Sequence, residues 1–158
     1  MTQRHPDPVV QSILDRNEVY DLVVRYARAL DERNWELLES CFVPEATYAY
    51  PNGSSGSAAE IVDRCSNALT RLDASQHLLG NIEITVNGDS ATTIVYFQAQ
   101  HVKMGTPGGN TFIIAGSYRD RVVRTASGWR IAHRDQAYAW MDGNPGVVAR
   151  PESMSVKP

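Results

Sequence analysis

The stretch from Val19 to Asp31, VYDLVVRYARALD, decides the fold because its apolar residues recur at helical spacing. The apolar positions that share one helical face are Val19, Leu22, Val23, Tyr26, Ala27 and Leu30. The spacing predicts an amphipathic helix in which the ring of Tyr26 is buried, so that its hydroxyl requires a hydrogen-bond partner. Asp31 ends this stripe, where an acid opposes the helix dipole. Helix chemistry therefore does not explain Asp31, and the alternative is a solvated acid in a helix-ending turn.

The composition indicates one globular domain. The chain has 158 residues, of which 42% are hydrophobic and 21% charged, and its net charge is −3. The basic residues form no block, which argues against nucleic acid or an anionic membrane surface as a partner. No apolar run approaches the ~20 residues that span a bilayer. The N-terminus lacks the apolar segment of a secretory signal, so we expect a cytoplasmic protein.

The cysteines and histidines suggest no metal and no cofactor. Cys41 and Cys65 each fall in a helical apolar pattern, which indicates two buried free thiols and fits a reducing compartment. The four histidines have no metal-ligand spacing relative to one another or to the acids. Phosphate-binding glycine loops, dinucleotide fingerprints and nucleophile elbows are also missing from the sequence.

Three helices are predicted in the first half, over residues 12–30, 34–42 and 57–72. The first begins near Ser12, after a flexible arm formed by residues 1–11, which contain two prolines. Pro44 ends the second helix. The third opens on a capping box between Ser57 and Glu60.

The second half alternates apolar and polar residues, which predicts strands. The expected strands are 46–50, 82–86, 90–103, 111–125 and 129–140, and residues 142–158 form an irregular tail. Helices followed by a meander indicate the α+β class, with three N-terminal helices packed on a curved antiparallel sheet. Such a sheet closes into a cone with an internal pocket, within one domain over residues 12–141.

His77 is the candidate general base. It is expected in the loop between the third helix and the long strands, and the following Leu78 and Leu79 direct that loop toward the core. Such a base needs a carboxylate that holds its tautomer and stabilises the charged ring, and Asp31 could supply it. The alternative is a surface or capping histidine.

Two further histidines lie on predicted strands. His101 shares a strand face with Phe97, so both are expected in the pocket wall with Tyr26 and with Tyr48 or Tyr50. His133 shares a face with Trp129 on the last strand. The alternative for each histidine is a hydrogen-bonded core residue.

The sequence resembles the SnoaL-like family of the nuclear-transport-factor-2-like superfamily over about residues 12–140. The segments that carry the resemblance are Arg25–Asp31 with Trp35 and Phe42, His77 with Gly80-Asn81, and Gly128–Ile131. The resemblance implies an α+β cone. Three members of the superfamily, scytalone dehydratase, lindane dehydrochlorinase and bile-acid 7α-dehydratase, use an Asp–His pair for elimination. Asp31 and His77 match that pair, and Tyr26 matches the tyrosine that completes the bile-acid site.

The same resemblance implies substrate-binding roles for further residues. His101, Tyr48 and Tyr50 correspond to substrate-binding positions of scytalone dehydratase. The basic residue on the last strand of the dehydrochlorinase corresponds to either His133 or Arg134, and the sequence does not choose between them.

The resulting hypothesis is a cofactor-independent lyase, a dehydratase or dehydrohalogenase, that acts on a small cyclic or polycyclic apolar substrate. His77 would remove a proton, Asp31 would orient it, and Tyr26 would donate a hydrogen bond. One alternative is a ketosteroid-type isomerase with the same pair. Another is a non-catalytic small-ligand-binding or association domain, in which the pair is separated or solvated. The outer sheet face, with Ile94, Tyr96 and Ile113, is apolar enough to predict a homodimer or homotrimer.

Overall fold

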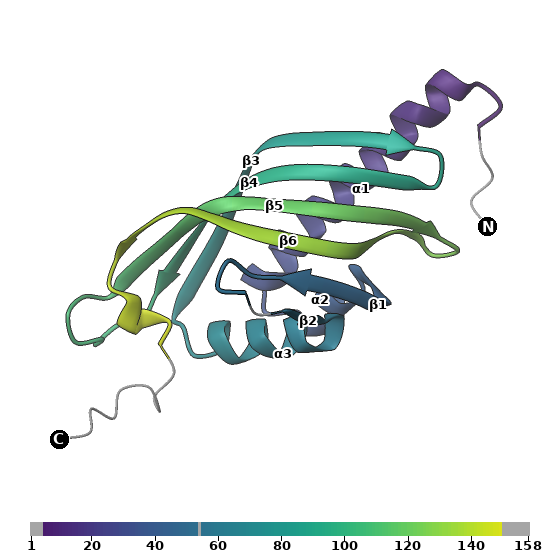
Figure 1. Ribbon diagram of the computed structural model, residues 1–158. Coiled ribbons are helices and arrows are strands. Elements are labelled where there is room, and N and C mark those ends of the chain that lie inside the picture. The colour runs from purple at the N-terminus through teal and green to yellow at the C-terminus, as the bar shows by residue number, and fades with distance from the viewer. Residues whose placement is uncertain (1–4, 54, 150–158) are drawn as a thin grey trace.

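The computed structural model describes residues 5–53 and 55–149. Its elements, in chain order, are α1 (Pro8–Asp31), α2 (Trp35–Glu39), β1 (Phe42–Ala49), β2 (Ser55–Ser57), α3 (Ala58–Leu69), β3 (Ala74–Asn87), β4 (Ser90–Val102), β5 (Thr111–Thr125), β6 (Gly128–Gly143) and the short 3-10 helix η1 (Pro145–Val147) (Figure 1). The predicted α+β arrangement of three helices on a curved sheet is confirmed. None of the helices in the described ranges is long and apolar enough to cross a membrane.

The six strands form one sheet in the order β2-β1-β6-β5-β4-β3. Strands β3 to β6 are antiparallel neighbours, as predicted, but β1 pairs in parallel with β6. The prediction of a purely antiparallel sheet is therefore wrong at this pair, and the sheet is mixed. Parallel neighbours need a long connection, which the chain between β1 and β6 provides through α3 and four strands.

The first helix begins at Pro8 rather than near Ser12. The Asp7 side chain caps it by accepting hydrogen bonds from the amides of Val9 and Val10, at 2.8 and 3.3 Å. A proline is favoured in the first helical turn, because its missing N–H needs no partner there. The flexible-arm prediction is therefore wrong for residues 8–11, and its first four residues lie outside the described ranges.

Several boundaries in the first half also differ from prediction. The second helix ends at Glu39, and Phe42 and Pro44 belong to β1. Pro44 lies within an irregularity of the β1–β6 pairing, a place where a strand tolerates a missing donor. Strand β3 begins at Ala74, so His77 lies in a strand and not in a loop. Residues 55–57 form the short strand β2 directly before α3.

The second half follows the predicted strands closely, and β6 continues to Gly143 before η1. The predicted irregular tail therefore contains regular structure at residues 142–147, and its last nine residues, 150–158, lie outside the described part of the chain.

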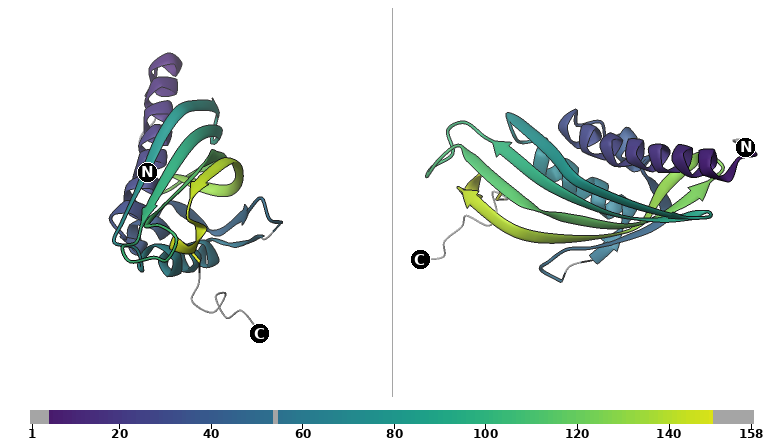
Figure 2. Two further views of the ribbon diagram at one scale, coloured as in Figure 1. Left: turned by 90° about the vertical axis from the view of Figure 1, so that its left-hand side faces the viewer. Right: turned by 90° about the horizontal axis from the view of Figure 1, so that it is seen from above.

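Bulges give the sheet its curvature. An extra residue interrupts β3 between Gly80 and Glu83, and β6 carries one opposite Ala115 and Gly116 and another opposite Arg121 and Val122. At Gly116 a Cβ would lie 1.9 Å from the carbonyl oxygen of Ala137, so this bend requires glycine. The bent sheet curves around α1, which lies across its concave side (Figure 2). The core therefore fills the space between the helices and this concave face.

Candidate active site

The Asp31 carboxylate and the His77 side chain form a hydrogen-bonded pair. Nδ1 of His77 lies 2.7 Å from Oδ1 of Asp31, within the distance expected for a dyad. The His77 side chain is 6% exposed and that of Asp31 is 26% exposed. A carboxylate can only accept, so Nδ1 carries the proton of this bond and Nε2 is the remaining ring nitrogen. His77 lines the internal cavity, and Asp31 lies behind it.

The edge of the sheet explains why Asp31 stands at a helix end. Strand β3 lies at the edge of the sheet, so no other strand of the described residues pairs with its outward amides. The main-chain amide of His77 donates to both Asp31 oxygens, at 3.1 and 2.9 Å. Asp31 thus satisfies an edge amide and the imidazole together, which offsets its unfavourable position at the C-terminus of α1. The alternative of a solvated acid in a turn does not fit these contacts.

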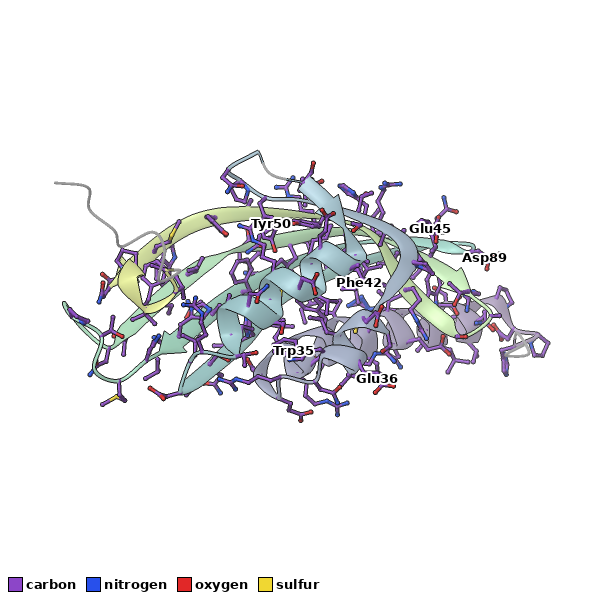
Figure 3. All side chains as sticks on the ribbon, turned by 90° about the horizontal axis from the view of Figure 1, so that it is seen from below. Trp35, Glu36, Phe42, Glu45, Tyr50 and Asp89 are labelled. Atoms are coloured by element: carbon purple, nitrogen blue, oxygen red, sulfur yellow. The ribbon has the colours of Figure 1, made fainter. Side chains whose placement is uncertain are left out.

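The cavity has a volume of about 140 Å³ between α1, α3 and the sheet. Its walls are aromatic, aliphatic and polar side chains: Tyr26, Leu30, Tyr50, Arg64, Cys65, Ala68, Leu69, His77, His101, Tyr118, Gln136 and Tyr138. Tyr50 follows the end of β1 close to α3 (Figure 3), and the Arg64 guanidinium of α3 lies 3.8 Å from its ring centroid. Both cysteines are free thiols as predicted, and burial raises the pKa of Cys65 to about 11.

Tyr26 lies between a buried ion pair and the cavity. The Arg134 guanidinium is 3.8 Å from the Tyr26 ring centroid and 4.2 Å from that of Tyr118. It donates twice to Asp120, at 2.7 Å each, and neither side chain is more than 4% exposed. Burial is the largest effect on Tyr26 and raises its pKa well above the ordinary phenol value, although the guanidinium opposes this. Tyr26 is therefore a protonated hydrogen-bond donor at neutral pH.

His101 is a neutral histidine with one tautomer favoured. Its Nδ1 lies 3.3 Å from the carbonyl oxygen of Phe112, which can only accept, so Nδ1 carries the proton. Burial, together with the nearby ring of His77, lowers the pKa of His101 to about 4. The two imidazole rings are perpendicular, with centroids 6.1 Å apart. In its neutral form His101 thus keeps Nε2 as a hydrogen-bond acceptor.

The cavity includes Tyr26, Tyr50, His77 and His101, as predicted, but not Phe97 or Tyr48. The Phe97 ring stacks against the Tyr118 ring with centroids 4.3 Å apart. Tyr118 therefore lines the cavity wall where Phe97 was expected. Tyr48 is buried beside Tyr50, with centroids 4.6 Å apart.

Neither of the two candidate basic residues on the last strand, His133 and Arg134, lines the cavity, and Arg134 is the buried one of the two. The extra residue in β6, Ala132, reverses which side chains face inward beyond that point. His133 therefore leaves the face of Trp129 and contacts the Thr47 hydroxyl at 2.7 Å, away from the cavity. Arg134 turns inward instead and supports Tyr26 from behind. The expectation that His133 shares a face with Trp129 is wrong for this reason.

Sequence reasoning missed several cavity residues. Gln136 and Tyr138 follow Arg134 at alternate positions, so they share its inward face. Correct assignment of that face depends on the bulge at Ala132, for which the sequence carries no signal. Arg64 was missed because it lies beside the predicted apolar stripe of α3. Across residues 5–53 and 55–149, no three side chains of the metal-binding types cluster together.

Comparison with known families supports the assignment of this architecture. Residues 11–135 match the model of the SnoaL-like domain, so the chain belongs to the SnoaL-like family. One relative is the uncharacterized protein Rv2910c of Mycobacterium tuberculosis, which is 34% identical over 128 residues, 79% of this chain and 86% of that protein.

Solved structures share the fold. A hexachlorocyclohexane dehydrochlorinase (LinA) Type2 has a TM-score of 0.74 at 16% identity, covering 90% of this chain and 97% of its own. A putative scytalone dehydratase from Novosphingobium aromaticivorans has a TM-score of 0.73 at 20% identity, covering 93% and 97%. An NTF2-like superfamily protein from Salmonella enterica has a TM-score of 0.72 at 18% identity, covering 82% and 94%. At these identities the similarity shows the NTF2-like fold alone. Any inference about the reaction has to come from the residues of the site.

Proposed function

We propose that this protein is a cofactor-independent lyase that removes water or halide from a small cyclic substrate. The observation that carries the proposal is the 2.7 Å contact between Nδ1 of His77 and Asp31, on a histidine that lines the cavity. The bond to Asp31 leaves Nε2 of His77 as the basic nitrogen, and the carboxylate stabilises the imidazolium that forms. A ligand-binding module has no need of such a pair, so the contact favours catalysis.

In the proposed step, His77 takes a proton from a carbon next to an activating group, such as a carbonyl. The electron pair of the broken C–H bond becomes the new C=C bond, and the C–O or C–halogen bond on the adjacent carbon breaks. Tyr26 remains protonated because its pKa is raised, so it stabilises the leaving group or developing oxyanion by donating a hydrogen bond. For a hydroxyl leaving group, the imidazolium returns its proton to the departing oxygen, and water leaves while His77 becomes neutral again. For a halide, the halide ion leaves and the imidazolium releases its proton to solvent.

The cavity limits the size of the substrate. An apolar cavity of about 150 Å³ holds one benzene molecule, and the volume here is about 140 Å³. One six-membered ring therefore fits inside, whereas a polycyclic skeleton would have to extend through the opening. The Nε2 acceptor of neutral His101 suits a hydroxyl on that ring. We therefore favour a single-ring alcohol with a carbonyl that acidifies the neighbouring C–H bond.

The test is a panel of cyclic β-hydroxy ketones, chlorinated cyclohexanes and hydroxy-steroids, assayed for double-bond formation by absorbance and mass spectrometry. We expect turnover of a single-ring member, with release of water or halide. The matched control pair is His77→Gln and His133→Gln, because both remove an imidazole but only His77 lines the cavity. A shifted double bond without release of a leaving group would indicate the isomerase instead. Binding without turnover by the unmodified protein would favour a ligand-binding domain.

A further inference from the structure

The turn that follows Asp31 has an arginine where glycine is usual. Arg33 has a φ of 55°, in the left-handed region. Its amide donates to the carbonyl of Leu30 at 3.2 Å, and the amide of Asn34 donates to that of Ala29 at 2.9 Å. These two bonds define a Schellman motif, whose left-handed position is usually glycine because a side chain is strained there. The strain at Arg33 indicates that its side chain makes a compensating contact.

The guanidinium of Arg33 provides that contact by donating to three carbonyl oxygens. Nε donates to Leu69 at 3.1 Å, and the terminal nitrogens donate to Leu72 at 3.1 Å and to Asp31 at 3.2 Å. Leu69 is the last residue of α3, and Leu72 lies just before β3. A cation is favoured beside carbonyls at helix C-termini. One side chain therefore links the end of α1 to the connection between α3 and β3.

The same two segments carry the catalytic pair. Asp31 is the last residue of α1, and His77 is the fourth residue of β3. A displacement of one segment relative to the other changes the 2.7 Å contact directly. Apolar packing of Leu30, Leu69 and Leu72 at this junction is non-directional, whereas the three hydrogen bonds of Arg33 fix its geometry.

We propose that Arg33 is a positioning residue for the dyad. Its guanidinium holds the end of α1 against the α3–β3 connection, so that the Asp31 carboxylate meets the ring and amide of His77. The catalytic meaning of this statement rests on the proposed function. The geometric part can be tested without any substrate.

The substitution Arg33→Gly removes the guanidinium while allowing the left-handed turn to form, so it tests the positioning role without disrupting the fold. Glycine adopts the left-handed conformation without strain, so the turn should persist and the thermal unfolding temperature should stay close to that of the unmodified protein. Long-range ¹⁵N–¹H NMR reads the His77 ring directly. The unmodified protein should show a protonated, slowly exchanging Nδ1 bonded to the carboxylate, and Arg33→Gly should lose this signal or populate the other tautomer. The control Arg28→Ala removes an arginine that is 58% exposed on the same helix, and should leave the signal unchanged.

Kinetics on an identified substrate give a second result. Arg33→Gly should lower kcat by about 10–100-fold, the range seen when a metal ligand loses the residue that orients it. KM should change little, because Arg33 does not line the cavity. Arg33→Lys keeps the charge but not the planar donor set, and should fall in between.

The proposal is overturned if folded Arg33→Gly keeps the His77 signal of the unmodified protein. If the glycine variant does not fold, the same NMR measurement on Arg33→Lys provides the test. A weakened His77 Nδ1 signal supports the proposal, and an unchanged signal overturns it. A signal that depends on Arg33, in a protein that turns over no substrate, would remove the proposed function and leave the positioning role intact.

Discussion

Asp31 accepts hydrogen bonds from both the ring and the main chain of His77, at 2.7 Å from Nδ1 and 2.9 Å from the amide nitrogen. The hydrogen bond from the His77 main-chain amide fixes the Asp31 carboxylate at the sheet edge. The carboxylate in turn fixes the rotation of the His77 imidazole. The two residues therefore form one rigid unit, and its chemistry depends on both of them.

The first prediction concerns this unit. Asp31→Asn and His77→Gln should each retain the fold and lower kcat by about 10²–10⁴-fold, the range for loss of a general base. An amide at position 31 cannot stabilise the imidazolium. The double variant should be little worse than either single variant, because residues that act together are not additive. Steady-state kinetics and circular dichroism measure both effects, and full activity in both single variants would refute the mechanism.

Tyr26 should contribute less than the base. Tyr26→Phe removes one hydrogen-bond donor from the cavity and leaves His77 in place, so kcat should fall by no more than about 10²-fold. Tyr48→Phe is the matched control, because Tyr48 is buried but does not line the cavity. Equal losses of kcat in the two variants would show that Tyr26 acts only through packing.

His101 should make folding stability depend on pH. Its pKa is lowered to about 4 in the folded protein, against about 6.5 in the unfolded chain. The unfolded state binds more protons between these values, so the free energy of unfolding should fall as the pH falls from 6.5 to 4, by up to about 3 kcal/mol from this group. Urea titrations at several pH values measure it. His101→Gln should flatten the curve over this window, and a slope unchanged by that substitution would contradict the assignment.

The Asp120–Arg134 pair should be sensitive to removal of its acid. Asp120→Asn leaves a buried guanidinium without its counter-ion, which costs about 3–5 kcal/mol of unfolding free energy. Asp89→Asn is the control, because Asp89 is 64% exposed although it lies 2.9 Å from Arg124, and an exposed pair contributes about 0–1 kcal/mol. Denaturant unfolding compares them, and similar losses would mean that burial of the ion pair is unimportant.

The outer face of the sheet carries a second hollow, which we call the outer groove. Its volume is about 590 Å³, and its walls include Leu78, Ile94, Tyr96 and Trp140, of which Leu78 is 65% and Tyr96 54% exposed. Exposed apolar surface of this kind marks association sites. We propose that copies of this chain associate through the outer groove as a homodimer or homotrimer. Light scattering should give a multiple of the chain mass, and Tyr96→Glu should yield a monomer. A monomeric unmodified protein would contradict the proposal.

The sequence by itself determined the elements whose signals are local. The apolar stripe from Val19 to Leu30 is buried as its spacing predicts, and the capping box between Ser57 and Glu60 opens α3. Strand alternation located β4 and β5 nearly to the residue. These features follow from neighbours three or four residues apart on a helix, or two apart on a strand, so one short window contains the whole signal.

Only the tertiary structure decided the relationships between distant segments. The bulge at Ala132 turned His133 outward and Arg134 inward, and β1 joined β6 in parallel. The approach of Asp31 to His77 depends on how α1 docks on the edge strand β3. Bulges and docking are set by long-range pairing, which leaves no periodic trace in the sequence. For that reason the residue types of the dyad could be read from the chain, whereas its 2.7 Å geometry and its support by Arg33 required the folded structure.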